Sequence, residues 1–307
     1  MKSKVKRRIS GILFGLIFLI GFGVLMYPTV SNQWNTYRQS KLINHYQQVV
    51  SQMKEEDFSA EWEKARAYND AMAYNALYDD AFGTSTEDLK STEYWKVLNV
   101  AGDGVMGYLS IPDIKVKLAI YHGSDETVLQ TGVGHINGTK LPIGGDTNHT
   151  VLAAHRGLPS ARLFTDIDQL EKGDVFYIYM MNETLAYQVD QILDMVDKDD
   201  AVALGEALAL EEGKDYVSLF TCTPYGVNSH RLIVRGTRIP YEEEIKEEVK
   251  VSAPEVMLES VQNYYSFYLI FGLSATFLLI VIMKFFMGRK RRKARREAKK
   301  AKKEAKF

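Results

Sequence analysis

Residues 216–239 of the chain read YVSLFTCTPYGVNSHRLIVRGTRI. The segment Tyr216–Thr221 alternates in side-chain character as a strand does, and Leu232–Ile239 is a second run rich in β-branched residues. Between them lie the turn formers Pro224, Gly226 and Asn228. This pattern predicts two consecutive β-strands joined by a turn.

Further short runs of the same kind lie upstream of this segment. We expect strands at Val105–Ile111, Val116–Tyr121, Thr150–Ala154, Val175–Met181 and Thr184–Met195. At least seven short strands at this spacing predict a β-barrel or a β-sandwich. Short helices are expected among them at Asp125–Thr131 and at Ala201–Glu212, the second ended by Gly213.

The two ends of the chain differ in composition from the middle. Uncharged apolar runs, Ile9–Met26 and Tyr264–Met283, are each flanked by Lys and Arg on the side nearer the terminus. Each run of about 18–20 residues forms about 27–30 Å of helix, enough to cross a bilayer. The positive-inside rule then places both termini in the cytoplasm and the segment between the runs outside the cell.

Each apolar run has an alternative interpretation. The first could be a cleaved signal peptide, although it ends in Leu25-Met26-Tyr27-Pro28 without a small-x-small cleavage pattern. The second could be a buried core helix, although the basic cluster that follows it is typical of a stop-transfer sequence. The basic tail Arg289–Lys306 is expected either to lie on the anionic inner leaflet or to be a solvated helix.

The middle of the chain is acidic. Between Ile9 and Met283 it carries 20 basic and 37 acidic residues, a formal charge of −17. Such a charge argues against a nucleic-acid-binding surface and for a solvated, acidic domain.

Six segments follow from these observations. Residues 1–30 form a basic end and a membrane helix, and residues 31–103 form one or two amphipathic helices and a loop. Residues 104–240 form the β domain, and residues 241–263 an acidic linker. Residues 264–287 form the second membrane helix, and residues 288–307 the basic tail.

Three residues can supply acyl-transfer chemistry. Cys222, the only cysteine in the chain, ends a predicted strand; Arg231 begins the next; and His155 follows the strand Thr150–Ala154. Acyl transfer needs a thiolate nucleophile, a proton donor for the leaving amine and a positive donor for the oxyanion. Taken singly, each could instead be structural: a buried thiol, a turn histidine and a surface arginine.

The residues around these three resemble those of a known family. The segment from Ser218 to Leu232, SLFTCTPYGVNSHRL, resembles the active-site segment of sortases, whose signature is T-L-x-T-C followed shortly by Arg. The segment Val151–Pro159, VLAAHRGLP, resembles the one that holds their catalytic histidine. Ser218 stands where the signature has Thr and keeps a hydroxyl. The resemblance extends from about Gly104 to Ile239.

Within the family, the chain resembles the class C enzymes, which polymerise pilins. The resemblance implies an eight-stranded sortase-type β-barrel with short helices, a helical N-terminal extension with a lid loop, and two flanking membrane helices. It assigns Cys222 as nucleophile, His155 as general acid/base and Arg231 as oxyanion stabiliser. The implied partners are pilins with LPxTG-like sorting signals, a pilin lysine as acceptor, and the membrane.

Class C sortases carry a lid with an Asp-Pro-aromatic motif. Asp80-Ala81-Phe82 lies at the corresponding place, with Ala where Pro is usual. The resemblance suggests that Asp80 pairs with Arg231 and that the ring of Phe82 covers the Cys222 sulfur. Loss of the Pro removes a φ constraint and predicts a looser lid. The alternative is a plain acidic linker.

The sequence is also compatible with other functions. The chain could be a housekeeping sortase that joins proteins to peptidoglycan, a hydrolytic cysteine protease, or a non-catalytic membrane-anchored binding protein. We expect no cofactor and no metal site, because the histidines His122, His135 and His149 lack metal-ligand spacing. The acidic run Asp194–Asp200 is expected to be a solvated turn. His230, as the strand neighbour of Arg231, is expected to face away from the sulfur.

Overall fold

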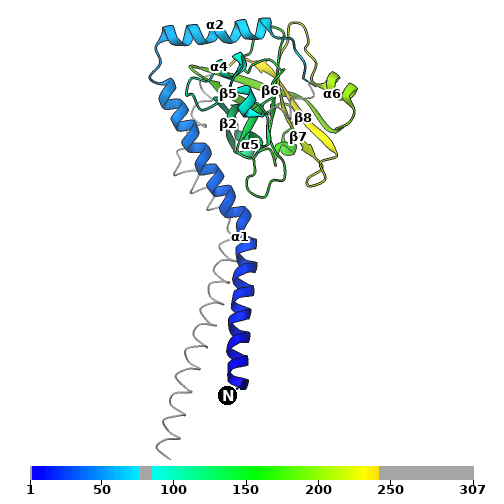
Figure 1. Cartoon of the computed structure of the whole chain (residues 1–307). Coiled ribbons are helices and arrows are strands. Elements are labelled where there is room, and N and C mark those ends of the chain that lie inside the picture. Colours follow the sequence, from blue (N-terminus) through cyan, green and yellow to red (C-terminus); the bar gives the residue numbers. More distant parts are fainter. Residues whose placement is uncertain (1, 77–84, 242–307) are drawn as a thin grey trace, which may run out of the picture. The chain divides into compact units, whose positions relative to one another are not determined.

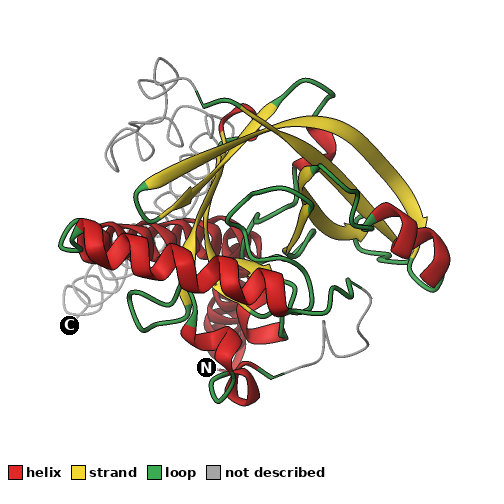
Figure 2. Ribbon diagram, turned by 90° about the horizontal axis from the view of Figure 1, so that it is seen from above, coloured by secondary structure: helices red, strands yellow, loops and turns green. Residues whose placement is uncertain are grey.

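The computed structural model describes residues 2–76 and 85–241, which belong to one compact unit. Eight strands form a closed barrel in the order β1-β2-β3-β4-β7-β8-β6-β5, and they curve round a common centre with the helices outside (Figure 2). The strands are β1 Val105–Ile111, β2 Val116–His122, β3 Val133–His135, β4 Asn148–Ala153, β5 Val175–Met180, β6 Glu183–Asp197, β7 Asp215–Thr223 and β8 His230–Ile239.

The helices are short apart from two at the N-terminal end. They are α1 Lys2–Val50, α2 Glu55–Ala71, α3 Thr86–Leu89, α4 Glu93–Lys96, α5 Glu126–Leu129 and α6 Ala201–Ala207, with 3₁₀ turns at Pro112–Ile114 and Ile167–Gln169. The predicted eight-stranded barrel with short helices and an N-terminal helical extension is confirmed.

Strand pairing brings distant parts of the sequence together. Most neighbouring strands are antiparallel, but β2 pairs with β3 and β4 pairs with β7 in parallel. In the β4–β7 ladder, Leu152 is the partner of Leu219 and Ala153 the partner of Phe220. The ends of β4 and β7 therefore lie side by side at one rim of the barrel.

The barrel wall is apolar on both faces near this rim. The interior core includes Leu152 of β4, Leu219 of β7 and Val234 of β8, all fully buried. A second, outer cluster covers the other face of the same strands under α6. Its buried members are Ala76, Ile136, Val151, Ala153, Leu204, Ala207, Leu208, Phe220 and Ile233.

The helix α1 is the one described helix that is long and apolar enough to cross a membrane, and its most apolar stretch is not buried. It continues past Pro28 to Val50 as a single helix, and its C-terminal half contacts β1 and β2 (Figure 1). There the buried Gln39 accepts a 2.8 Å hydrogen bond from Ala119 N, and Tyr46 Oη accepts one of 2.8 Å from Met181 N. The apolar helix and the barrel are therefore joined by a docked segment.

The structure departs from the predicted elements in several places. The short helices α3 and α4 were not predicted, and α5 ends at Leu129 and not at Thr131. The strand β3 was not predicted, since three residues including Gly134 are too few for an alternating pattern. The helix α6 ends at Ala207 rather than Glu212, because Leu208 is buried in the outer cluster and its carbonyl accepts from Tyr74 Oη. The second predicted membrane helix, the linker beyond Tyr241 and the basic tail lie outside the described residues.

Candidate active site

Cys222 lies near the end of β7 on the outer face of the barrel wall. Val217 and Leu219 of this strand belong to the interior core, and Phe220 belongs to the outer cluster. Because successive strand residues point to opposite faces, Cys222 shares the outer face with Phe220. Cys222 forms no disulfide, and the residue is partly exposed.

Arg231 is the direct cross-strand partner of Cys222 in the antiparallel β7–β8 ladder. Directly paired residues project to the same face, with Cβ atoms about 4.5–5.5 Å apart. Arg231 Nη1 donates to the carbonyls of Asn228, at 3.3 Å, and His230, at 3.1 Å. Its guanidinium carbon lies 5.9 Å from the centroid of the Phe220 ring, within cation–π range. These contacts hold the guanidinium on the face of the barrel wall that carries Phe220 and Cys222.

No carboxylate in the described part of the chain pairs with Arg231. The arginines that do form ion pairs there are Arg156, Arg162, Arg235 and Arg238. The positive charge of Arg231 is thus not neutralised by a described acid. A guanidinium in that state can stabilise a negative charge that develops beside the sulfur.

His155 reaches the same rim through the parallel β4–β7 pairing. Beyond the last ladder pair, Ala154 N donates to Phe220 O at 3.2 Å, and Thr221 Oγ1 donates to Ala154 O at 2.7 Å. His155 follows Ala154 directly, so it lies at the rim where β7 ends with Cys222 and Thr223. The structure therefore brings together all three residues singled out from the sequence: Cys222 from β7, Arg231 from β8 and His155 from the segment after β4.

Glu126, at the start of α5, is a further group at this site. Its Oε2 lies 3.4 Å from His155 Nε2, close enough for electrostatic attraction, but the orientation is not that of a hydrogen bond. His155 Nε2 is buried and has no hydrogen-bond partner among the described residues. Because the Glu126 side chain is 67% exposed, solvent weakens its attraction for an imidazolium. The sequence held no signal for Glu126, which is 29 residues from His155 in another element.

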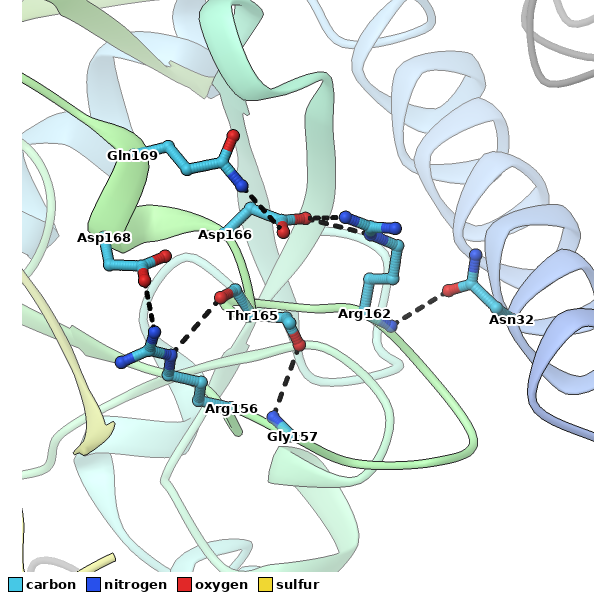
Figure 3. A network of polar contacts seen from close by, with 8 residues as sticks. All are labelled: Asn32, Arg156, Gly157, Arg162, Thr165, Asp166, Asp168 and Gln169. Carbon is cyan, nitrogen blue, oxygen red and sulfur yellow. Dashed lines mark hydrogen bonds and ion pairs between the residues drawn. The ribbon is translucent and has the colours of Figure 1, made fainter. Parts of the chain in front are cut away.

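The loop between β4 and β5 carries a polar network directly after His155 (Figure 3). Arg162 forms an ion pair with Asp166 at 2.6 Å, and Gln169 donates to Asp166 Oδ1 at 3.1 Å. Arg162 N also donates to Asn32 Oδ1 of α1 at 2.9 Å. On the other side of the network, Arg156 pairs with Asp168 and donates to Thr165 O. The loop is thus tied both to itself and to α1.

The residue that departs from the sortase signature has a structural role here. Ser218 Oγ lies 2.9 Å from Nε2 of the buried His149, whose Nδ1 lies 2.7 Å from Ala209 O. Because Nδ1 must donate to the carbonyl, Nε2 accepts from the Ser218 hydroxyl. Burial lowers the pKa of His149 to about 4. The hydroxyl at position 218 therefore supports a neutral buried histidine.

Three further histidines, His122, His135 and His230, contact other protein groups. His135 Nδ1 lies 2.7 Å from Tyr94 Oη and its Nε2 2.9 Å from Lys140 O; burial lowers its pKa to about 4. The ring nitrogens of His122 face the carbonyls of Gly104 and Val97. His230 is the cross-strand partner of Thr223, and its Nδ1 lies 2.8 Å from Ser229 Oγ.

No metal-binding group stands out in the described segments, where no three His, Cys, Asp or Glu side chains are close enough to hold an ion. In the acidic run at the end of β6, Asp200 accepts from Val202 N and Ala203 N and caps α6. Asp197 Oδ1 accepts from Asp199 N at 2.9 Å. The predicted lid residues Asp80 and Phe82 lie outside the described residues.

Comparison with known proteins gives one consistent family. The sortase domain model matches residues 109–239. Sortase D of Bacillus subtilis is 30% identical over 165 residues, which cover 52% of this chain and 76% of that protein. Sortase A of Bacillus anthracis is 28% identical over 234 residues, covering 75% and 95%.

Solved structures of sortases also match. Sortase C1 from Streptococcus agalactiae is 43% identical with a TM-score of 0.57, covering 66% of this chain and 100% of that one. Sortase C-1 from Streptococcus pneumoniae is 38% identical with a TM-score of 0.59, at 66% and 100% coverage. Both structures are of class C sortases.

Proposed function

The chain belongs to the sortase family of cysteine transpeptidases, and we propose that it is a class C, pilus-building enzyme. It cleaves an LPxTG-like sorting signal of a pilin between Thr and Gly and transfers the new acyl end to a lysine of another pilin. The cross-strand pairing of Cys222 with Arg231 is the observation that carries the proposed acyl transfer, and the 43% identity to a sortase C1 structure supports the pilin substrate.

The first half-reaction uses all three residues at the rim. The thiolate of Cys222 attacks the threonine carbonyl carbon, and the negative charge that forms on the carbonyl oxygen is held by Arg231. As the C–N bond breaks, His155 gives its proton to the glycine nitrogen, which leaves as a neutral amine. The product is a thioester between the pilin threonine and Cys222.

The second half-reaction resolves the thioester. The neutral ε-amine of a pilin lysine attacks the thioester carbonyl, and Arg231 again faces the oxyanion. His155, now neutral, takes the proton from the attacking nitrogen, and the C–S bond breaks to return the thiolate. An amide bond between two pilins results, so no cofactor and no energy source are required.

Cleavage of a sorting-signal peptide by the full-length chain in detergent micelles tests the first half-reaction. Cys222→Ala should abolish cleavage, because no other thiol exists in the chain. Turnover by Cys222→Ala would exclude the proposal. Failure of Cys222 to react with a thiol probe, even with the Asp80–Phe82 segment deleted, would favour a non-catalytic binding protein.

Competition between acceptors tests the second half-reaction. The enzyme is given the sorting-signal peptide together with a peptide carrying a pilin-type lysine and a peptidoglycan stem peptide. We expect the lysine adduct to predominate. A preference for the stem amine would identify a housekeeping sortase, and release of the free acid alone would identify a protease.

We propose that the chain is anchored by two membrane helices, α1 and the run Tyr264–Met283, with both termini in the cytoplasm and the barrel outside. The apolar, unburied stretch of α1 supports the first anchor. A reporter active only in the cytoplasm should be active when fused to either end. Activity at one end alone would contradict the two-helix topology.

A further inference from the structure

We propose that Arg156 is a positioning residue for the proposed reaction and that its guanidinium fixes the separation between His155 and Cys222. The inference rests on the proposed roles of those two residues. Arg156 directly follows His155, and Thr223 directly follows Cys222. Arg156 Nη1 donates to Thr223 Oγ1 at 3.0 Å, so one hydrogen bond joins the residues that flank the two reacting groups.

This link lies where the backbone ladder between the two segments ends. The last backbone hydrogen bond runs from Ala154 N to Phe220 O, followed by the side-chain bond from Thr221 to Ala154 O. Further along, the next hydrogen bond between the two segments in the described structure is that of Arg156 with Thr223. Without it, the chain around His155 would be bonded to β7 only through Ala154, on the N-terminal side of His155.

The guanidinium is itself held from three directions. Besides Thr223, it donates through Nε to Thr165 O at 3.3 Å, and Nη2 pairs with the carboxylate of Asp168 (Figure 3). The Arg156 side chain is only 11% exposed. A planar guanidinium with fixed partners on several edges is a rigid connector, which a lysine ammonium cannot replace in the same geometry.

The loop after Arg156 folds back and keeps this arrangement in place. Gly157 has φ +81°, a conformation that favours glycine, and its N–H donates to Thr165 Oγ1 at 3.3 Å. Phe164 N donates to His155 O at 3.1 Å. The ion pair with Asp168 therefore connects Arg156 to a folded loop and not to a free segment.

Positioning predicts a loss of rate rather than of substrate affinity. A displacement of about 1 Å between reacting groups can cost about 10²-fold in rate. Arg156 is directed at Thr223 and Asp168, not at the outer face that carries Cys222. Removing the guanidinium should therefore lower kcat and leave KM nearly unchanged.

Kinetics of the full-length chain in detergent micelles, with a sorting-signal peptide, provide the test. We expect Arg156→Gln to lower kcat by about 10–100-fold, with partial recovery in Arg156→Lys. Thr223→Val, which keeps the side-chain shape, should lower kcat less and add nothing in the Arg156→Gln background, because both changes remove the same bond. Arg162→Gln is the matched control, since Arg162 lies in the same loop but pairs with Asp166.

A second readout separates positioning from a general loss of stability. The rate of Cys222 alkylation as a function of pH reports how readily the thiolate forms beside His155. Its profile should change in Arg156→Gln and in Thr223→Val, and not in Arg162→Gln. This measurement needs no turnover, so it tests the inference even if the chain fails to cleave the peptide.

Three results would overturn the inference. The first is an unchanged kcat in Arg156→Gln, and the second is a rise in KM alone, which would mean that Arg156 binds substrate. The third is a double variant, Arg156→Gln with Thr223→Val, whose loss of kcat equals the product of the losses in the two single variants. If Arg156→Gln does not fold, an unchanged alkylation profile in the shape-preserving Thr223→Val decides against it.

Discussion

Cys222 and Arg231 face each other as direct partners in the β7–β8 ladder. Their relative position is therefore determined by strand pairing in the barrel wall and not by a mobile loop. Sites built on strands hold functional groups more precisely than sites built on loops. His155, by contrast, lies two residues beyond Ala153, the last paired residue of β4, and its placement depends on additional contacts.

Replacement of Arg231 should affect the reaction and not the fold. Arg231→Ala is expected to lower kcat by about 10²–10³-fold, the cost of losing one oxyanion donor. Arg231→Lys should recover little, because lysine lacks the guanidinium geometry. Steady-state kinetics of both variants give the measurement.

Arg238→Lys is the control for Arg231. It lies on the same strand, seven residues or about 23 Å further along, and its Nη1 is 3.9 Å from Asp215. Its kcat should stay near that of the parent. An equal loss of kcat in Arg231→Lys and Arg238→Lys would mean that the reaction depends on any arginine of β8 and not on the one paired with Cys222.

The predicted lid gives a kinetic prediction. If Asp80 and Phe82 cover the catalytic groove, the apparent affinity for substrate falls by the fraction of molecules that are open. One ion pair and one ring contact, without the usual Pro, should favour the closed state by only a few kcal/mol. Asp80→Ala combined with Phe82→Ala should therefore speed up Cys222 labelling and peptide cleavage together, with nearly unchanged thermal stability. Labelling as slow as in the parent would show that the segment is not a lid.

The buried His149 predicts acid sensitivity of the fold. Its pKa is lowered by burial from 6.5 to about 4, so below pH 6.5 the unfolded chain binds a proton that the folded chain does not. Stability must then fall as the pH decreases from about 6.5 to 4, by on the order of 3 kcal/mol for this residue. His135, with a pKa also lowered to about 4, acts in the same direction.

Thermal unfolding between pH 7.5 and 4 measures this effect. In His149→Gln the melting temperature should be lower than in the parent at pH 7.5 but should fall less steeply with decreasing pH. His135 remains in the variant, so the melting temperature should still depend on pH, but less steeply than in the parent. Equal slopes in variant and parent would show that His149 is not held neutral.

Docking of α1 should contribute to the stability of the barrel. Tyr46 is 2% exposed, and Tyr46→Phe removes the acceptor of Met181 N while keeping the ring. A buried donor left without a partner costs about 1–3 kcal/mol. Tyr37→Phe, at a position that is 50% exposed on the same helix, is the control. Denaturant unfolding should show the loss only at position 46, and equal effects at both positions would contradict the docking role.

Local sequence patterns predicted most of the strands, but they did not predict which strands pair or in which register. Alternation located seven strands, but Val133–His135 is too short to show a pattern. The parallel pairing of β4 with β7, which joins residues 67 apart and brings His155 to Cys222, is a tertiary property. Sequence motifs located the two segments without specifying that pairing.

The supporting groups of the site were predictable only in part. Arg156 and Thr223 adjoin His155 and Cys222 in the chain, but nothing in the sequence indicated that they bond to each other. Glu126 comes from a short helix after β2, and only the folded chain places it near His155. Such contacts depend on loop conformations that local periodicity does not encode.

Trapping the acyl-enzyme tests the proposed role of Cys222 as nucleophile. The full-length chain is mixed with a sorting-signal peptide in the absence of amine acceptors, quenched in acid and digested, and the peptide that contains Cys222 is weighed by mass spectrometry. We expect an adduct on Cys222 equal to the substrate up to and including its threonine, and we expect this adduct to disappear when a lysine peptide is added before the quench. Cleavage of the substrate without any adduct on Cys222, or an adduct on another residue, would contradict this role.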